Sequence, residues 1–406
     1  MSIESRELRI PPNRSVPLER RAKSEQIAKR TLDALARCFP DRRRQWGTFV
    51  LPEKPRIGIL LQWGIGDAVM TLPLLAGLRE ALPEAKIELL GKPWLDDLFG
   101  GTGLYDAAHT LVPPWTRYTG KYRVGRGAWR RYFAELQSAR QHRFDLVVSC
   151  RYDARDALQL RLLRSGARAA YGAAGGARWL DLDLGTPPSR AENASVHRDA
   201  AHTLCAITGL TAQSAPAFPR DEANTNAALA RLRDAGLERG PVVVVSHSAG
   251  HPIRKWEPEK LRNLLDRFSS RIGFLVIVQD PADPAPFRVH APPGVKSIVW
   301  SGSLTELRGL FRVADLTVCC DSGVMHIASA SGCRVVAIFG PTSPEWYGPY
   351  GSDDHVVIQR PMPCRPCFDQ CIYPEPVCMT AISEDMVEAA LGRALQPGHL
   401  AVLREF

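Results

Sequence analysis

Polar and glycine residues follow two apolar segments in the second half of the chain, and their types suit a phosphorylated ligand. Leu316–Cys319 runs into Asp321-Ser322-Gly323, and Val335–Phe339 stops at Gly340-Pro341-Thr342. The small-residue stretch between them carries His326, so the pattern predicts a strand–helix–strand unit. Ligands of open parallel sheets bind at the carboxyl ends of strands, and a helix N-terminus presents N–H groups to a diphosphate. The sequence therefore predicts a nucleotide-linked ligand here.

A second loop with this setting lies near the start of the chain. Gly64 and Gly66 follow the apolar segment Arg56–Leu61 and allow a ligand to approach the backbone closely. Asp67 comes at the start of the next helix, where its carboxylate is either an N-terminal cap or a base. With two glycines rather than three, the loop does not match a dinucleotide fingerprint.

A third loop follows the apolar run Val242–Ser246. Ser246 and Ser248 precede Lys255, whose ammonium is a suitable point charge for a diphosphate. The alternative is an ordinary strand–helix connection with exposed charges. For His326 the alternative is a core histidine, although the preceding Asp-Ser-Gly favours a site.

Composition indicates a folded α/β protein of two domains. The chain has 406 residues with 45% hydrophobic and 23% charged residues, which excludes a disordered class. Alternating short strands and helices predict parallel sheets. We expect a basic N-terminal extension over residues 1–52 with an amphipathic helix from Ser24 to Phe39. Two Rossmann-like domains follow, over residues 53–215 and 216–406. The first includes a helix from Ala68 to Leu82.

The sequence shows no apolar run long enough to cross a bilayer and no secretory h-region, so we expect a cytoplasmic protein. The net charge is +9, and residues 112–143 hold eight Lys or Arg against one acidic residue, Glu135, among several aromatic residues. Such a surface suits a phosphorylated lipid, an anionic membrane or nucleic acid. A solvated basic surface is the alternative.

Four of the ten cysteines are clustered near the C-terminus, at Cys364, Cys367, Cys371 and Cys378. Their spacing allows four thiolates to converge on one zinc or iron ion with a structural role. Free thiols or a local disulfide are the alternative. The other six are expected to be small core residues; they are Cys38, Cys150, Cys205, Cys319, Cys320 and Cys333.

These loops, in this order, resemble glycosyltransferase family 9, the bacterial heptosyltransferases that use ADP-heptose. The matching segments are RIGILLQWGIGDAVMTLPLL, VVVVSHSAGHPIRKW and ADLTVCCDSGVMHIASASGCRVVAIFGPT, within roughly residues 55–392. The resemblance implies the GT-B architecture, with the acceptor on the first domain and the nucleotide sugar on the second. Gln62-Trp63 and the proline-rich stretch 279–290 depart from the family pattern, so acceptor and nucleotide contacts can differ.

The resemblance also implies roles for the loop residues. Asp67 would be the base of an inverting transfer, and Lys255 would offset charge on the departing diphosphate, so that catalysis requires no metal. The backbone at Ser322 and Gly323 would contact phosphate, Asp321 the sugar hydroxyls and His326 the diphosphate. The remaining expected contacts are Ser246 and Ser248 with phosphate, Pro341 and Thr342 at the sugar, and Gly64, Gly66, Arg117, Lys121 and Arg123 with the acceptor.

The expected function is transfer of a heptose from ADP-heptose to the phosphorylated lipid A–core acceptor of lipopolysaccharide. The expected partners include an anionic membrane surface, at the cytoplasmic face of the inner membrane, and no nucleic acid. One alternative acceptor is an autotransporter protein, since some relatives modify such proteins and carry a cysteine-bound iron. A non-catalytic nucleotide-sugar-binding protein is the alternative from another class.

Overall fold

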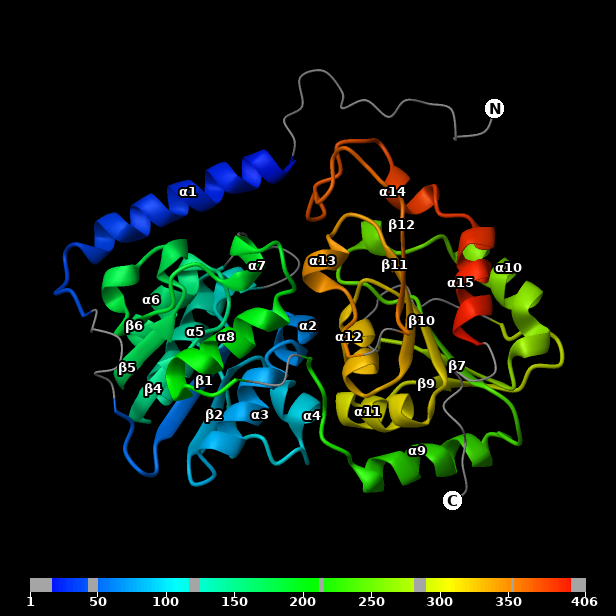
Figure 1. The fold of residues 1–406 in the computed structure, drawn as a ribbon, viewed down its shortest axis with the longest axis horizontal. Helices are drawn as coiled ribbons and strands as arrows, with labels where there is room; N and C mark the ends of the chain where they lie inside the picture. Colours follow the sequence, from blue (N-terminus) through cyan, green and yellow to red (C-terminus); the bar gives the residue numbers. More distant parts are fainter. Residues whose placement is uncertain are drawn as a thin grey trace. The chain divides into compact units, whose positions relative to one another are not determined.

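The chain divides after Pro216 into two compact units, each built on one six-stranded parallel sheet (Figure 1). The computed structural model describes residues 17–42, 50–116, 125–211, 215–280, 290–351 and 354–395. We call residues 22–216 the N-terminal unit and the part from Ala217 onward the C-terminal unit. The expected α/β class is confirmed.

In the N-terminal unit the strand order is β3-β2-β1-β4-β5-β6. Its strands are β1 (Arg56–Leu61), β2 (Lys86–Gly91), β3 (Ala107–Thr110), β4 (Phe144–Val148), β5 (Ser165–Ala170) and β6 (Leu182–Asp183). Its helices are α2 (Ile65–Val69), α3 (Leu72–Ala81), α4 (Leu95–Phe99), α5 (Arg126–Ala139), α6 (Ala154–Leu162), α7 (Pro188–Ala191) and α8 (His197–Thr208).

Both faces of this sheet are covered. Leu60 and Leu90 share one core cluster with Tyr132 and Leu136 of α5. Side chains alternate along a strand, so Ile57 faces the other side, where it is also fully buried. Burial on both faces explains why the strands are almost continuously apolar rather than alternating.

In the C-terminal unit the strand order is β12-β11-β10-β7-β8-β9. Its strands are β7 (Val242–Ser246), β8 (Phe274–Val278), β9 (Ser297–Trp300), β10 (Leu316–Cys320), β11 (Arg334–Phe339) and β12 (Val356–Gln359). Its helices are α9 (Glu222–Asp234), α10 (Pro258–Phe268), α11 (Leu304–Val313), α12 (Gly323–Ala330), α13 (Pro344–Tyr347), α14 (Val377–Thr380) and α15 (Glu384–Ala394).

Helices α10 and α15 cover one face of the second sheet, where Leu264 and Leu391 join Val243 in a single core cluster. Val242 and Val244 point to the opposite face and are fully buried there. Because helices cover both faces of this parallel sheet, only the ends of its strands remain accessible, and the polar loops lie there.

The predicted helix Ala68–Leu82 is wrong in its bounds, because the structure has two helices here. Helix α2 starts earlier, at Ile65, and α3 begins after Thr71 with Pro73 in its first turn. A proline lacks the N–H that a continuous helix needs, and its ring conflicts with the preceding turn. Pro73 therefore marks a new helix start rather than a position inside one.

Helix α1 (Pro17–Ala36) also differs from the predicted Ser24–Phe39. It docks on the N-terminal unit from Ala22 onward: Ala36 is fully buried in the core cluster, and the Asp33 carboxylate accepts a hydrogen bond from the Gly176 N–H at 2.8 Å. Ile27 stays 65% exposed, so the predicted apolar stripe is only partly used. Within the described ranges, no helix is both long and apolar enough to span a membrane.

The prediction that six cysteines are core residues is right for Cys319, Cys320 and Cys333, which are buried. It is wrong for Cys38 and Cys205, which are exposed. Cys38 lies in the turn after α1, and Cys205 lies on the outward side of α8, so an apolar neighbourhood in sequence did not imply burial.

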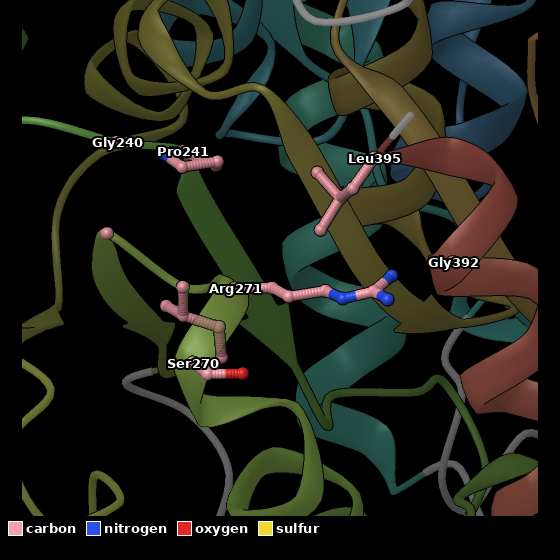
Figure 2. A pocket seen from close by; sticks show the side chains of 8 residues that line it. Gly240, Pro241, Ser270, Arg271, Gly392 and Leu395 are labelled. Carbon is pink, nitrogen blue, oxygen red and sulfur yellow. The ribbon is translucent and has the colours of Figure 1, made fainter. Parts of the chain in front are cut away.

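A pocket of about 580 Å³ lies at the amino-terminal edge of the second sheet (Figure 2). It is lined by Gly240 and Pro241 before β7, by Ser270 and Arg271 before β8, and by Leu395 after α15. The Arg271 side chain extends into it (Figure 2). This pocket is at the opposite strand ends from the predicted donor loops.

A substitution at Gly91 tests the close packing between β1 and β2. A Cβ at Gly91 would lie 1.8 Å from the Leu61 carbonyl oxygen, so Gly91→Ala must displace β1 or β2. We expect a loss of about 3 kcal/mol in the free energy of unfolding, measured by urea denaturation. Gly127→Ala in α5 is the matched control: a Cβ there meets nothing within 4 Å, and alanine should stabilise the helix by up to about 1 kcal/mol. Equal effects would contradict the packing.

Candidate active site

In the C-terminal unit, the predicted donor residues gather where the winding of the sheet changes direction. The chain builds β7, β8 and β9 outward and then returns to place β10 on the other side of β7. Ser246 ends β7, Ser322 follows β10, and Thr342 follows β11. In the register of the sheet Ser246 pairs with Cys319. The residues thus lie at adjacent carboxyl ends, where ligands of such sheets bind.

Two hydroxyl groups at this edge are buried without a partner among the described residues. They are the Oγ atoms of Ser246 and Ser322, on side chains that are 2% and 8% exposed. Ser322 is the N-cap of α12, yet its side chain makes no capping hydrogen bond. Burying a hydroxyl without a hydrogen-bond partner destabilises the fold. Both hydroxyls are therefore suited to donate a hydrogen bond to an oxygen atom of a ligand.

The Asp321 carboxylate is held by two side chains. Its Oδ2 accepts hydrogen bonds from Arg254 Nη1 at 3.0 Å and from Thr342 Oγ1 at 2.6 Å. Arg254 also makes a bidentate ion pair with Asp369, at 2.7 and 2.6 Å. Among the described residues, Oδ1 of Asp321 accepts no side-chain hydrogen bond. The guanidinium therefore orients Asp321, and its own charge is balanced by the two carboxylates.

The other predicted donor residues lie around the same strand ends. Lys255 and Ser248 are half-buried in the loop after β7, where Lys255 follows the short 3₁₀ turn Pro252–Arg254. His326 lies in α12 and is 6% exposed. Pro341 follows β11, and its carbonyl oxygen accepts a hydrogen bond from the Cys367 N–H at 2.9 Å. Their roles toward a ligand stay predictions.

In the N-terminal unit, Asp67 lies at the corresponding change of direction, between β1 and β4. It is in the first turn of α2, and its Oδ2 accepts a hydrogen bond from the Gly64 N–H at 3.0 Å. Its Oδ1 forms an ion pair with Arg151, which follows β4. Asp67 thus helps to close the first turn, as a cap does, and it is also paired with a cation. Both side chains are about one-quarter exposed, at 28% and 27%.

Trp63 connects this pair to a buried carboxyl group. The guanidinium groups of Arg151 and Arg155 lie 4.2 and 4.7 Å from the Trp63 ring centroid. The indole Nε1 donates to Asp156 at 3.2 Å, and Ser149 Oγ donates to the same carboxyl group at 2.7 Å. Burial raises the pKa of Asp156 to about 7, with the nearby Asp153 charge adding to the shift.

Of the five predicted acceptor residues, two lie in the part of the chain that the structure describes. Gly64 is the N-cap of α2 and Gly66 is within its first turn, whereas Arg117, Lys121 and Arg123 lie outside the described residues. Helix α5 carries the next part of the basic segment. Trp129 and Phe133 are 39% and 57% exposed on it and stack at 5.8 Å.

The four cysteines of the C-terminal cluster lie close enough together to affect one another. All four cysteines are free thiols. Burial raises the pKa of Cys367 to about 11 and that of Cys378 to about 12, and the neighbouring thiols add to both shifts. Among the described residues, no three of these sulfur atoms lie within 4.8 Å of one another. The four side chains are thus not arranged as a closed tetrahedral site in this structure, and zinc or iron binding at these cysteines stays a prediction.

One group of side chains does meet that spacing, at the amino-terminal half of the first sheet. Ligand atoms of Glu88, His109 and His142 lie within 4.8 Å of one another. The Glu88 carboxylate, however, accepts a hydrogen bond from Arg56 Nε at 2.7 Å and lies 3.5 Å from Lys86 Nζ. Two cations already surround one carboxylate, so the cluster is a buried ion-pair network rather than a cation site.

Comparison with known proteins identifies the family. The family model for glycosyltransferase family 9 (heptosyltransferase) matches residues 133–376, more than half of the chain. The chain belongs to this family. It is therefore a glycosyltransferase, as the sequence predicted.

The comparisons also include full-length relatives. Lipopolysaccharide heptosyltransferase 1 of Pseudomonas aeruginosa is 24% identical over 366 residues, which cover 83% of this chain and 97% of that protein. A family 9 glycosyl transferase from Veillonella parvula has a TM-score of 0.63 at 17% identity, covering 86% of this chain and 98% of that one. The Escherichia coli heptosyltransferase WaaC, solved with ADP, has a TM-score of 0.60 at 16% identity, covering 84% and 99%. The fold of this glycosyltransferase is thus the GT-B fold.

Sequence reasoning missed two arginines of this glycosyltransferase. The sequence predicts Lys255 as the cation of this loop, whereas in the structure the adjacent Arg254 pairs with Asp321. Arg151 had a usable signal, because it comes directly after the apolar run that forms β4 and so lies at the same sheet edge as Asp67. Neither pairing follows from a local pattern.

The raised pKa of Asp156 predicts a pH dependence of stability. Between about pH 4 and pH 7 the folded carboxyl group keeps a proton that the unfolded one has lost, so the free energy of unfolding falls as pH rises through this window. Asp156→Asn removes the titration and can keep both hydrogen bonds. From pH 5 to pH 8, the wild type should lose about 2 kcal/mol relative to this variant in urea denaturation.

Asp96→Asn is the control for this measurement, at an exposed carboxylate of the same unit whose partner is the Tyr105 hydroxyl. It should keep the wild-type pH dependence. A parallel pH profile for Asp156→Asn and the wild type would show that Asp156 does not carry the effect.

Proposed function

We propose that this glycosyltransferase transfers a heptose from ADP-heptose to the phosphorylated lipid A–core acceptor of lipopolysaccharide. The family supports the reaction class, and the name of the Pseudomonas aeruginosa relative supports the sugar and the acceptor. The observation that carries the proposal is the pair of buried hydroxyls, Ser246 and Ser322, beside the N-terminus of α12. This arrangement suits the diphosphate of a nucleotide sugar.

The donor diphosphate is proposed to bind against the first turn of α12. The N–H groups of Ser322 and Gly323 begin this eight-residue helix, whose dipole favours an anion at that end. The Oγ atoms of Ser246 and Ser322 would donate to phosphate oxygens and so gain the partners that they lack. Arg254 is already paired with two carboxylates, so we assign charge neutralisation at the leaving group to Lys255 and the N-terminus of α12 rather than to a metal.

The sugar is proposed to contact Asp321 and the start of the loop after β11. Arg254 and Thr342 occupy Oδ2 of Asp321, and Oδ1 is the atom proposed to accept from a sugar hydroxyl. Thr342 then acts through Asp321 rather than on the sugar directly. This refines the expected roles: Thr342 and Arg254 are positioning residues, and Pro341 borders the sugar.

The reaction is proposed as a single displacement with inversion. The acceptor oxygen forms a bond to the anomeric carbon of the heptose, and the bond from that carbon to the diphosphate oxygen breaks. Its electron pair leaves with ADP, and the hydroxyl proton passes to Asp67. Such a base contributes about a hundredfold to ten-thousandfold in rate.

The acceptor is proposed to approach from an anionic membrane surface. On one face of α5, Arg126, Arg130 and Arg140 are exposed along the same stripe as Trp129 and Phe133. A helix with exposed aromatic and cationic side chains binds at a membrane interface through both apolar and electrostatic terms. A peripheral position at the cytoplasmic face of the inner membrane follows from this proposal. The autotransporter acceptor has no comparable support among the relatives described above.

The direct test is mass-spectrometric detection of transfer from ADP-heptose to heptose-deficient lipopolysaccharide. We expect a gain of one heptose in the product. Asp67→Asn should lower kcat at least a hundredfold while donor affinity stays within about threefold of the wild type. Asp96→Asn controls for the loss of a carboxylate in the same unit. An active Asp67→Asn enzyme would exclude Asp67 as the base, and absence of transfer by the wild type would exclude the proposed substrates.

Membrane binding makes a separate prediction about α5. The double variant Trp129→Ala/Phe133→Ala should bind vesicles containing anionic phospholipid about tenfold more weakly in a sedimentation assay, because two exposed apolar groups are lost. Wild-type binding should weaken with rising salt concentration. Val299→Ala removes a similarly exposed apolar side chain, 46% exposed, in the C-terminal unit and is the control. Unchanged binding by the double variant would contradict the proposed surface.

A further inference from the structure

The carboxylate proposed as the base already has a partner on each oxygen in this conformation, and the space beside it is small. Asp67 Oδ1 is in an ion pair with Arg151, and Oδ2 accepts the hydrogen bond from the Gly64 N–H. A general base must lie within hydrogen-bond distance of the proton that it removes. The guanidinium occupies the side of the carboxylate that is not turned toward the backbone of α2.

The surrounding pocket leaves little room for an acceptor while Arg151 stays in place. Its lining includes Trp63, Asp67, Cys150 and Arg151, and its volume is about 30 Å³. That space holds about one water molecule. The Arg151 N–H donates to Ser149 Oγ at 3.3 Å, which fixes the backbone, whereas the guanidinium rests on the Trp63 ring. Because Arg151 lies beyond Val148, the last residue of β4, a change in the direction of its side chain does not require the strand to move.

The carboxylates near Arg151 are already engaged, so its ion pair with Asp67 affects the free energy of protonating Asp67. The neighbouring Arg155 makes a bidentate pair with Asp153, at 2.8 and 2.6 Å. Asp156 is buried and shared between Trp63 and Ser149. When Asp67 accepts a proton, the Arg151 guanidinium loses the charge of its partner in a site only about one-quarter exposed. Leaving one member of such a pair without a counter-charge costs free energy.

We propose that Arg151 binds an anionic group of the acceptor sugar, and that this contact withdraws the guanidinium from Asp67 and frees the base. The inference rests on the proposed function, because it assumes that Asp67 accepts the proton of the attacking hydroxyl. The anion is a carboxylate or a phosphate, since a guanidinium binds either through two parallel hydrogen bonds. It then supplies the charge that Asp67 loses on protonation.

This assignment gives the enzyme a selection step. An acceptor that has the correct hydroxyl but no anion nearby would leave Arg151 on Asp67, so the base would stay blocked. The anion is therefore expected to raise kcat and not only the affinity for the acceptor. A merely structural ion pair would affect all acceptors alike.

The test compares three acceptors with the full-length enzyme at saturating ADP-heptose. They are deacylated heptose-deficient lipopolysaccharide, the same material after reduction of its carboxyl groups, and the same material after dephosphorylation. For the wild type, one of the two treatments should lower kcat about tenfold or more, and this identifies the anion. For Arg151→Gln, treated and untreated acceptors should differ by less than about threefold, and the treated acceptor should react faster than with the wild type.

Arg79→Gln is the matched control, because it breaks an Arg–Asp pair in the same unit, with Asp106 at 2.8 Å, away from the strand ends of the site. It should keep the wild-type ratio between acceptors. Arg151→Lys keeps the charge without the planar fork and should give an intermediate ratio, which guards against misfolding of the glutamine variant. Equal slowing of all three acceptors by Arg151→Gln, or no discrimination by the wild type, would overturn the inference.

Calorimetric titration of the untreated acceptor, without donor, separates this inference from the proposed function. The wild type should bind it about tenfold more tightly than Arg151→Gln does. Equal affinities overturn the anion site even if heptose transfer is observed. Tighter binding by the wild type without heptose transfer would retain the anion site and instead exclude the proposed donor.

Discussion

The site of this glycosyltransferase depends on one topological constraint, the reversal of winding in the middle of each parallel sheet. A parallel strand needs a crossover that covers one face of the sheet, so both faces become buried and only the strand ends remain open. Where winding reverses, the loops after two neighbouring strands diverge. In the N-terminal unit these strands are β1 and β4, and in the C-terminal unit they are β7 and β10. The carboxyl ends of these four strands place the site residues Asp67, Arg151, Ser246 and Ser322.

The two edges carry different chemistry on the same scaffold. The C-terminal unit presents hydroxyl and N–H donors at the first turn of α12, which match a group that is already anionic when it binds. The N-terminal unit presents an ion pair, Asp67 with Arg151, over a tryptophan that is hydrogen-bonded to a buried acid. Such an ion pair suits a proton-transfer step, because protonation of the Asp67 carboxylate removes the negative charge that faces the Arg151 guanidinium. The residue types thus fit binding at one edge and proton transfer at the other.

Most of the architecture could be predicted from the sequence, because the strands are buried on both faces and are therefore short continuous apolar runs. Four predicted segments agree with strands of the structure to within one residue at each end: Arg56–Leu61, Val242–Ser246, Leu316–Cys319 and Val335–Phe339. The failures have local causes. Pro73 starts a new helix within the expected one, and the helix predicted from Ser24 begins at Pro17.

The site was less predictable than the fold for a physical reason. Residues that follow a strand, such as Asp67 and Ser322, can be placed at the carboxyl ends of the strands from topology alone. The arginines that pair with Asp67 and Asp321 reach them across 84 and 67 residues of sequence. Such pairs depend on side-chain reach in three dimensions, so no spacing in the sequence marks them. The same holds for the unpartnered hydroxyl of Ser246, whose burial is a property of the packed unit.

The most direct test of this account is a crystal structure of the protein with ADP bound. The account predicts that the diphosphate lies within hydrogen-bond distance of the Ser322 or Gly323 N–H and of the Ser246 hydroxyl. A diphosphate bound instead in the pocket at Arg271, or anywhere other than the carboxyl ends of β7 and β10, would contradict it.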